Sequence, residues 1–402
     1  MNITPFNQGY AKLQVLPIQN HRLKMRQMNR LISLSLFILV IFSVNCSKKK
    51  WKGTVEEENG VVVVKNPKKP MYGEDVLSMK EDLTIGEKEG REEYIFSGIH
   101  GIQYIDVDDN ENIYILDDKV SNIRVFDKNG KHLKTIGKIG QGPGEFQRPA
   151  YFIQVTPQKE IMVYDPPTRR FVLFSLEGEY LKQISGARIG GIPAEFKKNS
   201  RGNYVGCLLK GPPAIELKMF DSNLQPGLTI FLESEKPSPK GELTVLRPHL
   251  YFALTRNDDI IWGFSDKYEI QVVDFKGELK RRIIKDYKPV KINEKEKEII
   301  RERYGRLATL GMRYKLDFPK YFPPFNSMTV DEEGRIFVGT YEKTKYDWEY
   351  HDVFDAEGRY IARVPLRAIP YVWKKNKMYS IYRDEEGYTY VKRFKIQWNI
   401  NL

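Results

Sequence analysis

The feature that most constrains the fold of this chain is a repeated pattern of short strands. Each copy has an alternating strand, a turn of Asp, Asn and Gly, an apolar strand, a polar loop, a third strand, and an Asp-x-x-Gly turn before a fourth. Apolar residues that end the third strand lie 48, 46, 53 and 81 residues apart, and they are Phe126, Phe174, Phe220, Val273 and Phe354. The period is therefore about 45 residues once an insertion before the last of them is removed.

This period predicts a β-propeller, in which each four-stranded sheet, or blade, buries both faces against its neighbours. Six copies can be counted, of which the last, from Val372 to Ile396, is degenerate. We predict an all-β fold, a six-bladed β-propeller over residues 61–402, with a helical insertion at 287–322 between blades 4 and 5. A strand from residues 61–100, which include Val61–Val64 and Tyr94–Phe96, should complete the last blade and remove an open sheet edge. An array of two-sheet sandwiches is the alternative.

The N-terminal region has the pattern of an export signal. Residues 31–44 form an apolar stretch that follows Lys24, Arg26 and Arg30 and precedes Asn45 and Cys46. A bilayer-spanning helix needs roughly 20 such residues, so this shorter run is typical of a secretory signal. We interpret residues 1–45 as a signal peptide and 46–60 as a solvated tether. A noncleaved signal anchor is the alternative, and both place the remainder of the chain outside the cytoplasm.

Two motifs carry a resemblance to known families. Cys46 directly after the apolar stretch resembles the lipidated cysteine of bacterial lipoproteins, although Asn45 departs from their usual Gly or Ala. Residues 139–149, Ile-Gly-Gln-Gly-Pro-Gly-Glu-Phe-Gln-Arg-Pro, followed by Val163–Asp165, resemble the linker of NHL-repeat propellers. Over roughly residues 80–398 the chain thus looks like the six-bladed β-propeller lipoproteins of Gram-negative bacteria. The resemblance implies a lipid on Cys46 and an envelope membrane location.

The charge distribution argues against a nucleic-acid partner. The formal net charge is +12, but residues 1–50 contain eight Lys or Arg and no acid. Segment 287–322 holds ten more bases against five acids, so the rest of the body is close to neutral. A nucleic-acid-binding domain usually shows a broad basic surface. Neither this distribution nor the export signal fits a nucleic-acid-binding protein.

The insertion 287–322 is the clearest departure from the repeat. Asn293 followed by Glu296 predicts a helix start, and Pro319 with the prolines after it ends any helix. Arginine suits carboxylate and phosphate recognition, so we expect an anionic partner such as an acidic protein, a glycan or lipid headgroups. The candidate partner-binding residues are Arg301, Arg303, Tyr304, Arg306, Arg313 and Tyr314, with Tyr321 and Phe322 as further exposed aromatics. A solvated decoration of one blade edge is the alternative.

Signals for catalysis are sparse. None of the five histidines has metal-ligand spacing, and no nucleophile motif is present, so no metal ligand or catalytic residue is assigned and any cofactor is unknown. Asp117 and Asp165 occupy equivalent positions after the second strand, where they could face a channel mouth or cap a turn. Cys207 lies in an apolar run and is expected to be a buried free thiol.

These observations favour a lipid-anchored extracytoplasmic propeller that acts as a binding or scaffold module for a protein or glycan ligand. We expect a monomer attached to the membrane through Cys46. The alternative is a metal-dependent lyase or hydrolase with its site in the central channel, since the six-bladed relatives include such enzymes. No motif carries the metal ligands of those enzymes onto this chain.

Overall fold

The computed structural model describes residues 50–96, 102–117, 120–147, 150–211, 214–234, 241–308 and 315–400. The chain divides into two compact units, Met1–Lys50 and Trp51–Leu402, of which the second carries the fold described below. Cys46 and the expected signal peptide lie outside the described residues. No helix among the described residues is long and apolar enough to cross a bilayer.

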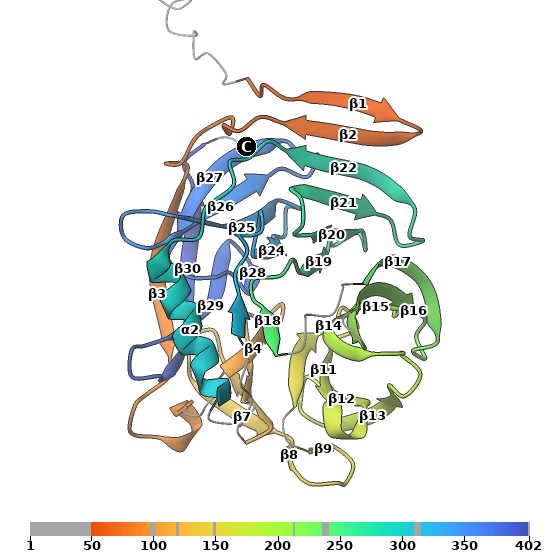
Figure 1. The fold of residues 1–402 in the computed structure, drawn as a ribbon. Helices are drawn as coiled ribbons and strands as arrows, with labels where there is room; N and C mark the ends of the chain where they lie inside the picture. The colour runs from red at the N-terminus through yellow and green to blue at the C-terminus, as the bar shows by residue number, and fades with distance from the viewer. Residues whose placement is uncertain are drawn as a thin grey trace, which may run out of the picture. The chain divides into compact units, whose positions relative to one another are not determined.

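Six sheets of at least four strands make up the fold, and we number them in chain order of their innermost strands (Figure 1). Sheet 1 consists of β4 (Ile102–Val107), β5 (Ile113–Asp117), β6 (Asn122–Phe126) and β7 (His132–Ile136). Sheet 2 consists of β10 (Tyr151–Val155), β11 (Glu160–Asp165), β12 (Arg170–Ser175) and β13 (Tyr180–Ser185). Sheet 3 consists of β14 (Ile192–Lys198), β15 (Tyr204–Lys210), β16 (Ala214–Phe220) and β17 (Pro226–Ser234).

The other three sheets follow the same antiparallel order. Sheet 4 consists of β19 (Leu250–Leu254), β20 (Ile260–Phe264), β21 (Glu269–Val273) and β22 (Leu279–Lys285), extended by β2 (Val61–Asn66) and β1 (Thr54–Glu58). Sheet 5 consists of β24 (Ser327–Val330), β25 (Ile336–Lys343), β26 (Glu349–Phe354) and β27 (Tyr360–Leu366). Sheet 6 consists of β28 (Val372–Lys374), β29 (Lys377–Arg383), β30 (Thr389–Trp398) and β3 (Leu77–Ile85).

The Asp-x-x-Gly turns form as the sequence predicts. Between β6 and β7, one carboxylate oxygen of Asp127 accepts hydrogen bonds from the amides of Asn129 and Lys131, at 2.8 and 2.9 Å. Gly130 in this turn has a φ of 82°, a conformation that is strained for residues with a side chain. The same turn joins the two outer strands of sheet 4 at Asp274–Gly277 and of sheet 5 at Asp355–Gly358. Ser175 replaces the aspartate in sheet 2, and Leu224 replaces the glycine in sheet 3.

Apolar clusters join every pair of neighbouring sheets. Six clusters of buried side chains lie between sheets 1 and 2, 2 and 3, 3 and 4, 4 and 5, 5 and 6, and 6 and 1 in the described part of the chain. The repeat residues Phe126, Phe174, Phe220, Val273 and Phe354 are all buried in them. Because both faces of each sheet are covered, the six sheets form a closed ring, which confirms the predicted six-bladed propeller.

The N-terminal strands close the ring and also extend one blade. β3 pairs antiparallel with β30, so an N-terminal strand completes the last blade as predicted. β2 instead pairs in parallel with β22, and β1 pairs with β2. The prediction of a tether through residue 60 is therefore wrong for Thr54–Glu58, whose backbone is held by pairing although the strand is exposed. Tyr94 and Phe96 form no strand but pack beside Phe126.

The insertion lies between β22 of sheet 4 and β24 of sheet 5, as expected, and carries α2 (Glu294–Ala308). Its start has the predicted reciprocal cap, in which the Glu296 amide donates to Asn293 Oδ1 at 2.9 Å and the Asn293 amide donates to Glu296 Oε2 at 2.8 Å. The remaining short elements are β8 (Lys138–Ile139), β9 (Glu145–Phe146), β18 (Glu242–Thr244), β23 (Lys315–Asp317) and the 3₁₀ helices η1 (Glu92–Tyr94) and η2 (Pro166–Thr168). β23 pairs in parallel with β18.

Candidate functional site

Polar contacts link neighbouring blades where the innermost strands end. Between sheets 1 and 2, Asp106 Oδ2 accepts a hydrogen bond from the Val155 amide at 2.7 Å. Between sheets 2 and 3, the Gln154 side chain accepts from the Lys198 amide at 2.6 Å and donates to its carbonyl at 3.0 Å. Backbone groups of one blade are thus bound by side chains of the blade before it.

The same end of the ring carries the links to the next two blades. Asp258 of sheet 4 accepts hydrogen bonds from the amide and the hydroxyl of Ser200 in sheet 3, at 2.8 and 2.6 Å. Arg256 of sheet 4 forms an ion pair with Glu332 of sheet 5. Both acids follow the innermost strand of their sheet, in the turn that leads to the second strand.

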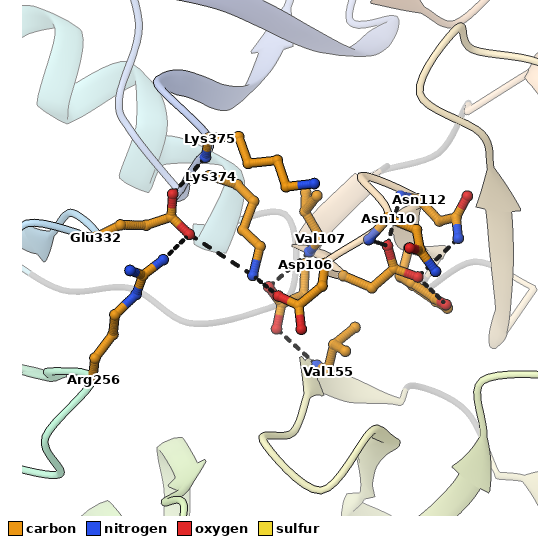
Figure 2. A network of polar contacts seen from close by, with 12 residues as sticks. Asp106, Val107, Asn110, Asn112, Val155, Arg256, Glu332, Lys374 and Lys375 are labelled. Atoms are coloured by element: carbon orange, nitrogen blue, oxygen red, sulfur yellow. Dashed lines mark hydrogen bonds and ion pairs between the residues drawn. The ribbon is translucent and has the colours of Figure 1, made fainter.

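Two further contacts complete the circle (Figure 2). The Lys375 amide of sheet 6 donates to Glu332 of sheet 5 at 2.6 Å, and Lys374 Nζ lies 2.5 Å from Asp109 Oδ1 of sheet 1. Figure 2 shows this run of contacts from Arg256 through Glu332 and Lys374 to the sheet 1 turn. A continuous ring of polar contacts therefore holds all six blades together at this end.

A pocket of about 790 Å³ opens inside this ring of contacts. It is lined by residues from all six sheets, which makes it one end of the central channel. Its lining includes amides and hydroxyls from Asn110, Gln154, Thr156, Asn199, Ser200 and Thr329, together with the ring of Tyr371. Such convergent polar groups on a rigid concave surface are typical of a ligand site.

The channel wall is formed by one repeat position. This position lies two residues before the turn that follows the innermost strand, and in sheets 1 to 5 it is occupied by Asp106, Gln154, Lys197, Ala253 and Thr329. All five are partly exposed, whereas most of the second-strand residues behind them are buried. This position is not among the residues predicted from the sequence, although its regular spacing to the turn marks it as a repeat position.

Asp106 and Lys197 are the charged residues at this repeat position, and of the two only Lys197 lines the pocket. Asp106 accepts from the Val107 amide at 2.8 Å as well as from Val155. Burial raises the pKa of Asp106, while the nearby Lys197 ammonium favours its charged form. Lys197 also pairs with Glu195 at 3.4 Å. Asp106 thus supports the wall by holding two backbone amides, and Lys197 is the charged group that this repeat position presents to the pocket.

The pocket lining as a whole is balanced in charge. Its five acids are Asp108, Asp109, Glu177, Glu195 and Asp258, and its five bases are Lys159, Lys197, Lys198, Arg256 and Lys374. Several are already committed to ion pairs in the ring of contacts, as described for Lys374 and Arg256. The pocket therefore lacks the positive excess that the sequence concentrates in the insertion, and it suits a polar ligand with little net charge.

The predicted channel-mouth residues lie at the other end of the strands. Asp117 pairs in register with Ile102 at the start of β4, whereas the pocket is lined by residues beyond the end of β4. Asp165 ends β11 next to the start of β10 in the same way. Both are buried in ion pairs, Asp117 with Arg124 at 2.9 Å and Asp165 with Arg170 at 3.2 Å. They do not line this pocket, and each pairs with an arginine on the next strand of its own blade.

The structure describes only part of the predicted partner-binding set on the insertion. Arg301 is paired with Glu298 at 2.9 Å within α2, and Tyr304 is half-buried. Arg303 and Arg306 belong to α2 but their side chains are not described, and Arg313 and Tyr314 lie outside the described residues. The expectation of an exposed Phe322 is wrong, because its ring stacks on Tyr341 at 4.2 Å and is buried.

Within the described ranges, no group of three His, Cys, Asp or Glu side chains is placed to hold a metal ion. His351 is fully enclosed beside Asp352, and burial lowers its pKa to about 4. Cys207 is buried and free, as expected, and burial raises its pKa to about 12. Neither side chain lines the channel pocket.

Comparison with known proteins supports the fold. Residues 87–204 match the model of a family described as a 6-bladed beta-propeller, DUF5128. A protein described as exported, from Bacteroides fragilis, shares 13% identity over 84% of this chain and 100% of its own, with a TM-score of 0.50. A DUF4221 member from Bacteroides vulgatus shares 12% identity over 81% of this chain and 99% of its own, with a TM-score of 0.47.

Virginiamycin B lyase from Staphylococcus aureus covers 79% of this chain and 99% of its own, at 8% identity and a TM-score of 0.42. Likenesses at such identities concern the fold alone. A comparison with curated protein sequences found no match. The six interlocked sheets and the match over residues 87–204 identify this chain as a six-bladed β-propeller.

Proposed function

We propose that this propeller is a lipid-anchored extracytoplasmic binding module that holds a segment of a glycan or protein in its channel pocket. The observation that carries the proposal is the 790 Å³ pocket, to which all six blades contribute. Its walls are fixed by contacts between every pair of neighbouring blades, so a ligand meets a preorganised surface. Amides, hydroxyls and balanced charges suit the hydroxyl groups of a sugar or the backbone of an extended peptide.

Export and anchoring rest on the N-terminal sequence. The apolar stretch 31–44 and Cys46 support a lipoprotein signal, and the propeller begins only a few residues later with β1. We expect a fatty-acid probe fed to cells expressing the full chain to label the wild type and not the Cys46→Ala variant. Label that persists in the variant, or a wild type that never acquires label, would contradict lipidation at Cys46.

The channel site is tested by filling it. Ala253 lies on β19 in the pocket wall, and Ala253→Trp should occupy part of the channel. Thr329→Trp fills the same space from sheet 5 and guards against a folding defect in the first variant. Ala187→Trp is the matched control, because Ala187 is exposed in the loop before β14, away from the pocket.

The probe is an array of neutral and charged oligosaccharides and of extended peptides. We expect the wild type and Ala187→Trp to retain the same array members, and both channel variants to bind them about tenfold more weakly or worse. A wild type that binds no member contradicts the binding role. Equal binding by the channel variants places the ligand elsewhere on the protein.

Elemental analysis separates this role from the enzyme alternative. A stoichiometric divalent metal in the purified wild type, lost in the channel variants together with array binding, would favour a metal-dependent lyase or hydrolase instead. We expect metal content to be the same in the wild type and all three variants.

A further inference from the structure

The start of the folded chain lies beside the root of the insertion. Trp51 Nε1 donates to Asn66 Oδ1 at 3.0 Å, and the Asn66 carbonyl accepts from the Asp286 amide at 3.1 Å. Asn66 ends β2 opposite Lys285, the last residue of β22, and the insertion follows directly. Figure 1 shows the start of β1 next to the ends of β2 and β22.

The length of chain between Cys46 and Trp51 sets a limit on any anchor. The two residues are five positions apart, so their Cα atoms can be separated by at most about 18 Å. A lipid on Cys46 would therefore keep Trp51, and with it the root of the insertion, close to the membrane surface.

The root of the insertion carries exposed positive charge. The first and last parts of the insertion pair here. The Phe322 amide donates to the Val290 carbonyl at 2.9 Å, and Lys291 and Tyr321 form an isolated antiparallel β-bridge. We call this region the arm base and define it by its exposed side chains, which are Lys288, Lys291, Lys295, Lys320 and Tyr321. Tyr321 is 41% exposed, and Lys320 Nζ lies 5.2 Å from the centre of its ring.

In the described part of the chain, the lysines of the arm base are not neutralised by ion pairs, unlike Lys297 and Arg301 on α2. Lys297 pairs with Glu294 at 2.7 Å and Arg301 with Glu298, so these bases are neutralised locally. Within the described residues, none of the four lysines of the arm base forms an ion pair. Two acids nearby are occupied, Glu294 by Lys297 and Glu296 by the helix cap.

We infer that the arm base lies against anionic lipid headgroups and supplies a second membrane contact beside the anchor. The inference rests on the proposed lipidation of Cys46 for its proximity to the membrane. Clustered lysines are attracted to anionic membrane surfaces, and tyrosine is enriched at the level of the headgroups. A lipid chain combined with a basic patch is also a common two-signal arrangement for stable attachment.

An acidic protein is the other macromolecule that lysines could meet. The short link to Cys46 favours the lipid surface, because the anchor holds the arm base near headgroups whether or not a protein partner is present. The arm base also belongs to the end of the blades opposite the channel pocket, since the end of β22 and the start of β19 lie at the same end of sheet 4 and β24 follows the insertion. Contact with lipid there leaves the pocket open.

The test is an amine-reactivity footprint of the full lipidated chain, reconstituted into vesicles and read by mass spectrometry, with Lys295 as the reporter. Vesicles of phosphatidylcholine alone are compared with vesicles that contain about 30% phosphatidylglycerol. We expect Lys295 to react about threefold more slowly on the anionic vesicles, and this protection to disappear in concentrated salt.

The triple variant Lys288→Glu, Lys291→Glu, Lys320→Glu should lose the protection of Lys295. The matched control Lys128→Glu, Lys131→Glu, Lys182→Glu makes the same charge change at exposed positions of blades 1 and 2 and should keep it. Equal Lys295 reactivity on both vesicles overturns the inference, as does protection that survives in the triple variant. Protection seen only in native envelope membranes assigns the arm base to a protein partner instead.

Vesicle flotation in the same samples reports on the anchor separately. A chain that does not float has no anchor, which contradicts the proposed function as well. A chain that floats without protection of Lys295 keeps its anchor and contradicts the arm-base contact alone.

Discussion

At the scale of single residues, the polar groups inside this propeller are tied to particular partners. Asp352 is one example, because it accepts hydrogen bonds from Tyr268 and Tyr360, at 2.6 and 2.5 Å, and pairs with Lys285 at 3.2 Å. The Lys285 ammonium lies 4.8 Å from the centre of each tyrosine ring. This cluster joins sheets 4 and 5, next to the strand that brings in the N-terminal hairpin.

Removing the Asp352 carboxylate should therefore destabilise the folded protein. In Asp352→Ala the buried Lys285 loses its ion pair, and we expect the free energy of unfolding to fall by about 3–5 kcal/mol. Urea denaturation followed by tryptophan fluorescence measures the change. The double variant Lys285→Met, Asp352→Leu should recover most of it, since no buried charge is left alone. A loss below about 1 kcal/mol in Asp352→Ala would show that water reaches the cluster.

Cys207 provides a second test at this scale. Burial against apolar neighbours raises its pKa to about 12, which suppresses the reactive thiolate in the folded protein. We expect iodoacetamide to leave Cys207 unmodified up to about pH 9 in the native state and to modify it fully in urea. Peptide mass spectrometry identifies the modified residue, and rapid labelling of native protein would mean that the strand β15 opens readily.

At the scale of elements, local sequence predicts most of what forms. The Asp-x-x-Gly turns, the strands that they join and the cap at Asn293 and Glu296 all depend on neighbouring residues, so the sequence alone indicates them. The hairpin of β1 and β2 depends on pairing with β22, more than 200 residues away, and nothing in its own residues shows that partner. The channel wall was not predicted for a related reason, since residues such as Gln154 and Lys197 form a site only when six blades meet.

The cap of α2 can be tested on its own, because its two hydrogen bonds join only Asn293 and Glu296. Asn293→Ala removes the acceptor for the Glu296 amide, and we expect α2 to lose about 1 kcal/mol of local stability. Hydrogen exchange of the α2 amides should speed up, while exchange in the six sheets stays unchanged. Lys295→Ala is the control, and faster exchange across the whole protein would mean that α2 supports the blades.

At the scale of the whole molecule, the ring is closed at two places, once between sheets 6 and 1 and once within sheet 6. Lys374 and Asp109 join sheets 6 and 1 at the pocket end, and within sheet 6 the N-terminal strand β3 pairs with the C-terminal strand β30. Arg393 reinforces the outer closure, since it binds both oxygens of Asp82 on β3 at 2.9 and 3.1 Å and also donates to the Lys128 carbonyl of sheet 1. We therefore expect the shape of the pocket to depend on both closures.

The Asp82–Arg393 contact should make part of the stability depend on pH. Burial acts to raise the pKa of Asp82, but Arg393 and Lys395 outweigh it and leave the pKa lowered overall. A lowered folded-state pKa adds stability above the unfolded value of about 4, and this stability is lost as the pH falls through the folded-state pKa. Asp82→Asn should therefore reduce the free energy of unfolding by about 1.5–3 kcal/mol at pH 7.

The difference between wild type and Asp82→Asn should shrink steadily below pH 4, because the wild-type carboxylate becomes neutral there as well. Urea denaturation of both proteins from pH 7 to pH 3 measures it, and Glu385→Gln, an exposed acid in the β29–β30 loop, is the control with no expected effect. A constant difference across this range would mean that Asp82 acts through its shape and hydrogen bonding rather than its charge. A difference that vanishes in acid would show that the ion pair between Asp82 on β3 and Arg393 on β30 holds the ring, and with it the channel, closed.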